Sequence, residues 1–128
     1  MQVAVFDTYV RKRDGSTVHF DIIAPKETTP EQAITFGKTY LQDVAPEGRI
    51  SSRECQLCHI EEPSAEVISA ILDKGFYILE FDDIPAELPA NPTRRQLIEH
   101  IRAQSEEYRF ANFRGVEEER LWEIIRGL

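Results

Sequence analysis

The stretch FDTYVRKRDGSTVHFDI, residues 6–22, decides the fold, because it predicts a β-hairpin and also selects its register. Its turn signal is Arg13-Asp14-Gly15, which suits a three-residue loop with glycine in the left-handed position of a bulge. That loop pairs Val10 with Val18 and keeps the apolar residues on one face. A two-residue Asp14-Gly15 turn would shift the register by one residue and mix the two faces. The hydrophobic pattern therefore favours the three-residue loop.

The predicted hairpin has an apolar face and a polar face. The apolar face carries Phe6, Val10, Val18, Phe20 and Ile22. The polar face carries Asp7, Tyr9, His19 and Asp21. An imidazole flanked by carboxylates is held in one tautomer and is made more basic, which suits a general base or a metal ligand. The alternative interpretation is a solvated strand face with ordinary cross-strand pairs.

The chain after the hairpin alternates between predicted helices and strands. The capping-box sequence Thr29-Pro30-Glu31-Gln32 opens a helix at about residues 30–44, with apolar residues at helical spacing. A second amphipathic helix is predicted at about residues 64–74. The strand that follows, residues 76–81, is apolar on both sides and is therefore predicted in the interior of the sheet.

These elements predict an α+β domain with one four-stranded sheet in the order strand, strand, helix, strand, helix, strand. We expect both helices to cover the apolar face of the hairpin. Residues 1–84 form this core domain, and three prolines mark residues 85–92 as a linker. The expected fold is thus an α+β core with a helical C-terminal extension.

Residues 93–128 are predicted to form this helical tail. Thr93-Arg94-Arg95-Gln96 repeats the capping-box pattern, and a second helix is predicted at about residues 116–126. All seven basic residues of the chain after residue 84 are arginines. Neither helix can keep its apolar stripe in water alone, so the tail is expected to dock on its own sheet or on a second subunit. The stiff, proline-rich linker favours the second arrangement, a homodimer through the C-terminal helices.

The sequence RECQLCHIEE, residues 53–62, brings together both cysteines of the chain, a histidine and several carboxylates. Cys55, Cys58 and His59 match the spacing of covalent c-type haem attachment. Such attachment belongs to exported proteins, and the chain begins with no export signal. The only methionine is Met1, so a His/Met axial pair lacks its second partner. Haem is therefore disfavoured.

Three other interpretations of the two cysteines remain open. One is a zinc-type metal site formed by Cys55, Cys58, His59 and His19, the last on a neighbouring strand. Another is a dithiol that cycles between reduced and oxidised forms, although the carboxylates nearby, Glu61 among them, should raise a thiol pKa. The third is a cysteine that serves only as a core residue of a strand.

The local geometry decides between these interpretations. If residues 53–61 form a regular strand, Cys55 and Cys58 point to opposite faces of the sheet. Their Cα atoms then lie roughly 10 Å apart, beyond the ~7 Å limit for a disulfide. A shared metal ion and a disulfide are both excluded in that case. A turn at Gln56-Leu57 would instead allow either of them.

Composition and charge limit the class of protein to which the chain can belong. A length of 128 residues with 41% hydrophobic and 30% charged residues is typical of one globular domain, or of a small domain with an appendage. The net charge of -8 repels a polyanion, so nucleic acid is not an expected partner. No window approaches the ~20 apolar residues of a membrane span. We expect a cytoplasmic protein, in which thiols stay reduced.

Four segments together resemble a family of small bacterial proteins catalogued as a domain of unknown function. They are FDTYV at residues 6–10, HFD at 19–21, CxxCHxE at 55–61 and GFYI at 75–78. The resemblance covers about residues 2–82 and does not extend into the tail. It implies a compact α+β domain and brings no activity, substrate or cofactor with it.

The expected function is accordingly stated at the level of class. We expect a non-enzymatic binding or regulatory protein with a Cys/His site of the zinc type. The alternative is a thiol-dependent redox protein or enzyme that uses Cys55 or Cys58.

Overall fold

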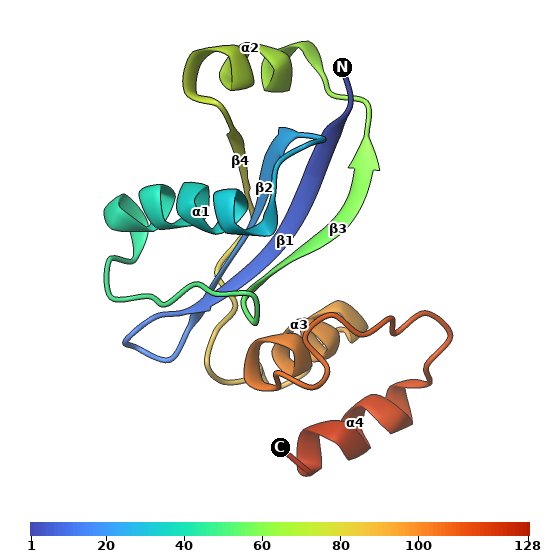
Figure 1. Cartoon of the computed structure of the whole chain (residues 1–128). Helices are drawn as coiled ribbons and strands as arrows, with labels where there is room; N and C mark the ends of the chain where they lie inside the picture. The colour runs from blue at the N-terminus through green and yellow to red at the C-terminus, as the bar shows by residue number, and fades with distance from the viewer.

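The computed structural model describes the whole chain, residues 1–128, as a four-stranded sheet with four helices (Figure 1). The elements are, in chain order, β1 (Val3–Arg11), β2 (Thr17–Pro25), α1 (Pro30–Val44), β3 (Cys55–Glu61), α2 (Ala65–Lys74), β4 (Tyr77–Glu80), α3 (Arg94–Gln104) and α4 (Glu118–Arg126). The predicted α+β class and the predicted order of the elements are confirmed. The helices are all too short or too polar to span a membrane.

The sheet is antiparallel throughout and has the strand order β3-β1-β2-β4. The hairpin register is the predicted one, since Val10 lies opposite Val18 and Phe6 opposite Ile22. Gly15 has a φ of 89°, the left-handed conformation that the three-residue loop requires. The hydrophobic pattern of β1 and β2 was therefore sufficient to fix their pairing.

Helix α1 covers one face of the sheet and forms the main core with it. Ala33 and Leu41 of α1 pack against Phe6, Phe20 and other even-numbered residues of β1 and β2. The predicted capping box of α1 is present in full, with Thr29 and Gln32 bonding each other's backbone N–H groups. A Cβ on Gly37 would clash with the side chain of Ile50 and press on that of Ile22. The absence of a side chain at Gly37 therefore lets α1 lie close to these two residues.

Helix α2 lies on the opposite face, so the prediction that both helices cover one face is wrong. Its buried residues, Val67 and Ile71, pack against Val3, Val5 and Ile23, which are odd-numbered residues of the hairpin. The odd face is apolar at the end where β1 begins and carries polar residues from the Asp7–Asp21 pair onward. The connection from β3 to β4 joins the two edges of the sheet and crosses it at that end (Figure 1).

Strand β4 is an edge strand and not the predicted interior strand. Its apolar character on both sides has another cause, because helices cover both faces of the sheet beside it. Ile78 packs against the α1 core, and Tyr77 packs against the α2 cluster. Partial burial on both faces therefore does not require a neighbouring strand on each side.

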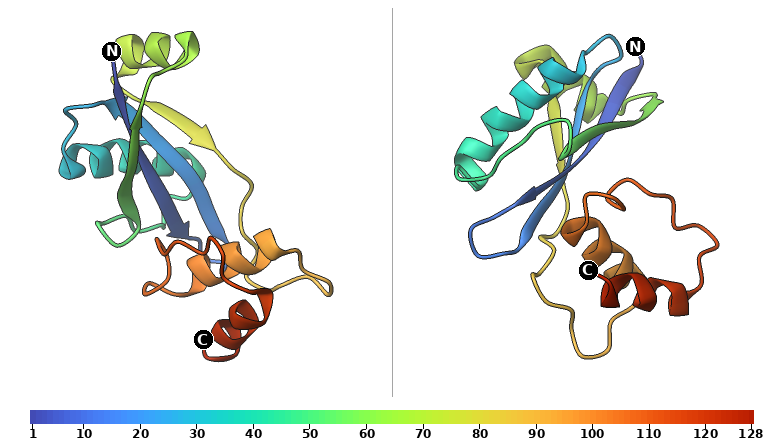
Figure 2. Two further views of the ribbon diagram at one scale, coloured as in Figure 1. Left: turned by 90° about the vertical axis from the view of Figure 1, so that its right-hand side faces the viewer. Right: turned by 60° about the horizontal axis from the view of Figure 1, so that its bottom comes forward.

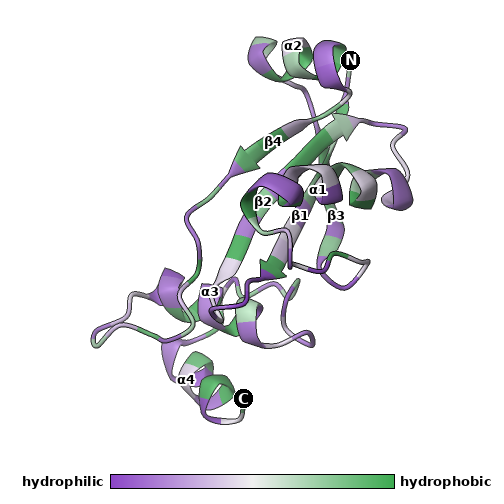
Figure 3. Cartoon of the chain, turned by 90° about the vertical axis from the view of Figure 1, so that its left-hand side faces the viewer, coloured by the Kyte–Doolittle hydropathy of each residue, from purple (hydrophilic) through white to green (hydrophobic).

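The C-terminal helices lie at the far end of the molecule from α2, and the two chain termini lie at opposite ends (Figures 1 and 2). Leu97, Ile101, Phe113 and Leu121 form a separate small core between α3 and α4. Figure 3 shows hydrophobic and hydrophilic residues alternating along α4, as expected of an amphipathic helix.

The tail contacts the core domain of its own chain through α3. Tyr9 of β1, Ile84 and Ala103 of α3 form a buried cluster, against which Phe110 packs. Arg109 donates hydrogen bonds to the carbonyl oxygens of Arg102, Ala103 and Arg53 and forms an ion pair with Glu54. These contacts place α3 over the end of β1 that α2 leaves free.

Candidate functional site

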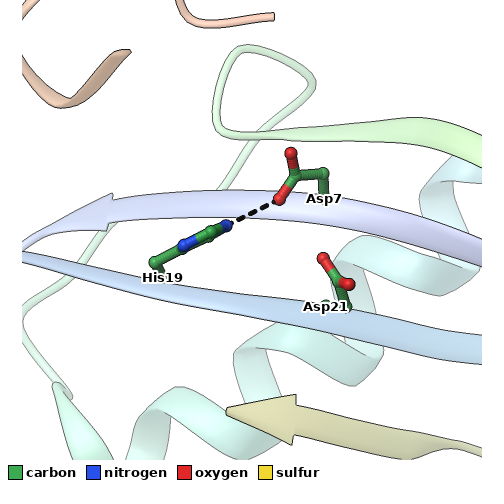
Figure 4. A group of neighbouring side chains, drawn as sticks. All are labelled: Asp7, His19 and Asp21. Carbon is green, nitrogen blue, oxygen red and sulfur yellow. Dashed lines mark hydrogen bonds and ion pairs between the residues drawn. The ribbon is translucent and has the colours of Figure 1, made fainter. Parts of the chain in front are cut away.

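A polar group lies on the odd face of the hairpin, between the area covered by α2 and the area covered by α3. Asp7 and Asp21 face each other across β1 and β2, and His19 is the partner of Tyr9 two pairs further along, on the same face. One potential ligand atom from each of Asp7, His19 and Asp21 lies within 4.8 Å of the other two (Figure 4). The β-pairing that the apolar face dictates thus brings these three side chains together.

His19 is held in place from three directions. Its ring stacks on Tyr9 with a centroid distance of 4.3 Å and on Phe81 with a centroid distance of 4.5 Å. Its Nε2 atom lies 2.9 Å from Oδ1 of Asp7 (Figure 4). The side chain keeps 14% of its surface exposed, so the imidazole is fixed and yet accessible.

Asp21 carries the clearest electrostatic perturbation of the group. Burial, followed by the neighbouring negative charge of Asp7, raises the pKa of the Asp21 carboxyl to about 7. The charge of Glu61 on β3 makes a smaller contribution to the raised pKa of Asp21. Two carboxylates at this separation cannot both ionise freely, so the site holds a proton near neutral pH that a cation could replace.

Tyr9 is buried beneath this group and closes it on the side of the tail. Only 1% of the residue is exposed. Burial, and then the charge of Asp7, raises the pKa of the Tyr9 phenol, while Arg102 of α3 opposes this increase. Tyr9 therefore stays protonated and acts as a rigid aromatic support for His19.

The two cysteines are separated by the pleat of β3. Cys55 is buried in the α1 core, whereas Cys58 is exposed, and both are free thiols. Val5 pairs with His59 and Phe6 pairs with Leu57, so Cys58 is the extra residue of a β-bulge. Burial is the largest cause that raises the pKa of each thiol, and the charges of Asp7 and Asp21 add to it for Cys58.

The structure does not assemble the four metal ligands that the sequence predicts. Cys55 faces the opposite side of the sheet from His19, and His59 forms an ion pair with Glu61 at the exposed edge of β3. Asp7, His19 and Asp21 form the only group of three or more His, Cys, Asp or Glu side chains close enough to share an ion. Of the predicted ligands, His19 is within this group. Cys58 lies close enough for the charges of Asp7 and Asp21 to raise the pKa of its thiol.

Two residues at the site were missed by sequence reasoning. Phe81 is the last residue of the strand predicted at 76–81 and directly follows β4, and it reaches His19 only because β4 pairs with β2. Arg102 belongs to the tail, and nothing in the sequence indicates that α3 lies over β1. Both omissions concern contacts between elements, which local patterns do not encode.

Comparison with known proteins supports the resemblance of the core. A family model described as "Domain of unknown function (DUF2024)" matches residues 1–81. Protein NE1680 from Nitrosomonas europaea, solved by NMR, is 37% identical, with a TM-score of 0.58 over 64% of this chain and 96% of that chain. No curated protein matches the chain. Because the family model spans more than half of the sequence, the chain belongs to the family of the domain of unknown function DUF2024.

Proposed function

We propose that the protein is a binding domain for a divalent transition-metal ion, held by Asp7, His19 and Asp21. The observation that carries this proposal is the placement of two carboxylates and one imidazole within 4.8 Å of one another. Adjacent strands of a rigid hairpin carry all three, which reduces the conformational entropy lost on binding. This form of the Cys/His hypothesis keeps His19 and replaces the cysteines by carboxylates.

The electrostatics of the site support a cation as its ligand. Burial, and then the charge of Asp7, raises the pKa of Asp21 to about 7, so ionising both carboxylates is unfavourable in the absence of a positive charge. A divalent cation relieves this repulsion and displaces the proton. Affinity should therefore rise with pH as Asp21 ionises, up to and slightly beyond neutrality.

The donor set selects the class of metal. Two carboxylate oxygens and one imidazole nitrogen suit Zn²⁺ or Mn²⁺, with the remaining positions open to water or a ligand. Mg²⁺ prefers oxygen ligands alone and retains its water shell. We expect affinity to fall in the order Zn²⁺, Mn²⁺, Mg²⁺, which follows the general trend for mixed nitrogen and oxygen sites. Cys58, exposed beside Asp7 and Asp21, is the candidate for a further Zn²⁺ ligand.

Isothermal titration calorimetry of the reduced, metal-free protein with Zn²⁺ tests the proposal. We expect one ion per chain, with Asp21→Asn and His19→Gln each weakening the affinity at least tenfold. Asp82→Asn and His59→Gln make the same chemical changes outside the group and should leave the affinity within about twofold. An equal loss of Zn²⁺ affinity in the control variants, or no saturable Zn²⁺ binding at pH 8, would contradict a site at this position. Cys58→Ser reports whether the thiol adds a ligand.

The alternative, a thiol-dependent redox protein or enzyme, gains less support. A reactive cysteine needs a lowered thiol pKa and access to solvent. The pKa of both thiols is raised, and Cys55 is also buried. The proposal also includes a cytoplasmic location and the absence of a nucleic-acid partner, the latter because the net charge of -8 repels a polyanion.

A further inference from the structure

A cavity of about 710 Å³ lies between the sheet and the C-terminal tail, next to the candidate metal site. Tyr9 and His19 line it from the sheet. Residues of α3 and of the segment between α3 and α4 line it from the tail. Its size is within the range of pockets that hold small organic ligands.

The charge of this cavity is opposite to that of the whole protein. Four arginines line it, Arg94, Arg95, Arg102 and Arg114, with Glu99 as the one acidic lining residue. The full chain has a net charge of -8. Four of the seven arginines of the tail therefore gather at one cavity, where their positive potential is concentrated.

Most of these guanidinium groups have no carboxylate partner within the protein. Arg95 pairs with Glu99 at 3.1 Å, whereas the other three form no ion pair. Arg94 and Arg102 each donate to a backbone carbonyl of the segment after α3, those of Phe113 and Ala111. The Nε atom of Arg102 is buried and has no hydrogen-bond partner, and its guanidinium lies over the Phe113 ring. Only this Nε atom is fully buried, whereas Arg102 as a whole is partly exposed, so its positive charge contributes to the cavity.

We infer that this cavity binds a small molecule with a phosphate group, an inference that goes beyond the proposed metal site. Several forked guanidinium groups match the geometry of phosphate oxygens and provide strong, charge-assisted hydrogen bonds. Tyr9 and Phe113 also line the cavity but are almost fully buried, so the arginines are the groups that would contact the ligand.

The arginines all follow residue 81, where the match to the family model ends. The core alone therefore provides only Tyr9 and His19 to this cavity. The phosphate site is accordingly a feature that the tail adds to the family domain.

Calorimetric titration of the full-length protein with pyrophosphate, at low salt and with EDTA present, tests this inference. EDTA removes free metal ions, so binding through the candidate metal site does not contribute. The double variant Arg95→Gln/Arg114→Gln changes two exposed arginines of the cavity and should fold normally. Arg120→Gln/Arg126→Gln removes the same charge from α4, outside the cavity. We expect saturable binding that the first pair weakens at least tenfold and the second pair changes less than twofold.

Three calorimetric results would overturn the inference. They are the absence of saturable binding, equal weakening by the two double variants, and equally tight binding of citrate, which would assign the cavity to carboxylates. Amide chemical-shift changes on adding pyrophosphate provide the position of binding. They should concentrate around Tyr9, His19 and residues 94–115, and changes confined to other surfaces would also count against the site.

Discussion

Asp21 is a carboxyl group whose ionisation opposes folding. Its pKa in the folded chain is raised to about 7, above the ordinary value of about 3.9 for an aspartate, so the folded state binds its proton more tightly than the unfolded state. Its contribution to stability is therefore lost as the pH rises from about 4 through 7. Above pH 7 the carboxylate is held at a site that disfavours its charge.

We predict that Asp21→Asn stabilises the fold increasingly from pH 5 to pH 8. After allowance for partial solvent exposure, the gain in the free energy of unfolding at pH 8 should be about 1–2 kcal/mol. Urea denaturation at both pH values measures it, and Asp82→Asn serves as the control on an exposed loop. A gain that is the same at both pH values would show that Asp21 has an ordinary pKa. The same variant should lose metal while it gains stability, which separates a binding defect from unfolding.

At the scale of the element, the pleat of β3 gives its two cysteines different chemistry. We predict that iodoacetamide modifies Cys58 in the native protein and Cys55 only after denaturation, because Cys55 is 6% exposed. The modification of Cys58 should be slow at pH 7 because its thiol pKa is raised. Mass spectrometry of the peptides, with Cys55→Ser and Cys58→Ser as single-thiol controls, follows both positions. Rapid modification of both thiols, or a disulfide between them, would contradict the assigned strand.

Elements also show what can be predicted from sequence and what cannot. The hairpin register, the caps of α1 and the left-handed Gly15 follow from residues close together in the chain, and all are confirmed. The face chosen by α2 and the edge position of β4 depend on the path of the whole chain across the sheet, and both predictions were wrong. The polar group of Asp7, His19 and Asp21 followed from the hairpin alone. Its neighbours Phe81 and Arg102 could not be predicted, because they belong to parts of the chain far from the hairpin in sequence.

For the whole molecule, the question is what the tail does for the core. Its apolar stripes are largely used within the chain, since Leu97, Ile101, Leu121 and Ile124 are buried between α3 and α4. Arg11 of β1 donates to the carbonyl oxygen of Ala103, which adds a polar contact to the α3 interface. These contacts favour docking of the tail on its own core over the homodimer that the stiff linker suggests.

We predict that a chain ending at Asp83 folds but is about 2–4 kcal/mol less stable than the full chain, because it loses the apolar cover of Tyr9. Removal of that cover should also bring the pKa of Tyr9 back toward its ordinary value, since burial is the main cause that raises it. Circular dichroism with urea measures the first effect, and ultraviolet titration of phenolate measures the second.

Sedimentation of both chains decides between the two arrangements of the tail. A monomer in both cases agrees with docking on the same chain. A full chain that is a dimer and becomes a monomer on truncation would support the predicted homodimer with two-fold symmetry. Equal stability of both chains, with an unchanged Tyr9 titration, would show that the tail does not support the core.

The bulge at Cys58 also affects how the protein behaves in a crowded solution. The outer strands β3 and β4 carry backbone groups that could template the addition of a strand from another molecule. The bulge interrupts the regular spacing of β3, and the polar pair of His59 and Glu61 adds desolvation cost there. β4 has only four residues and is followed closely by Asp82 and Asp83. Neither edge is long, flat and uncharged, so the fold is protected against strand-by-strand aggregation without a partner to cover its edges.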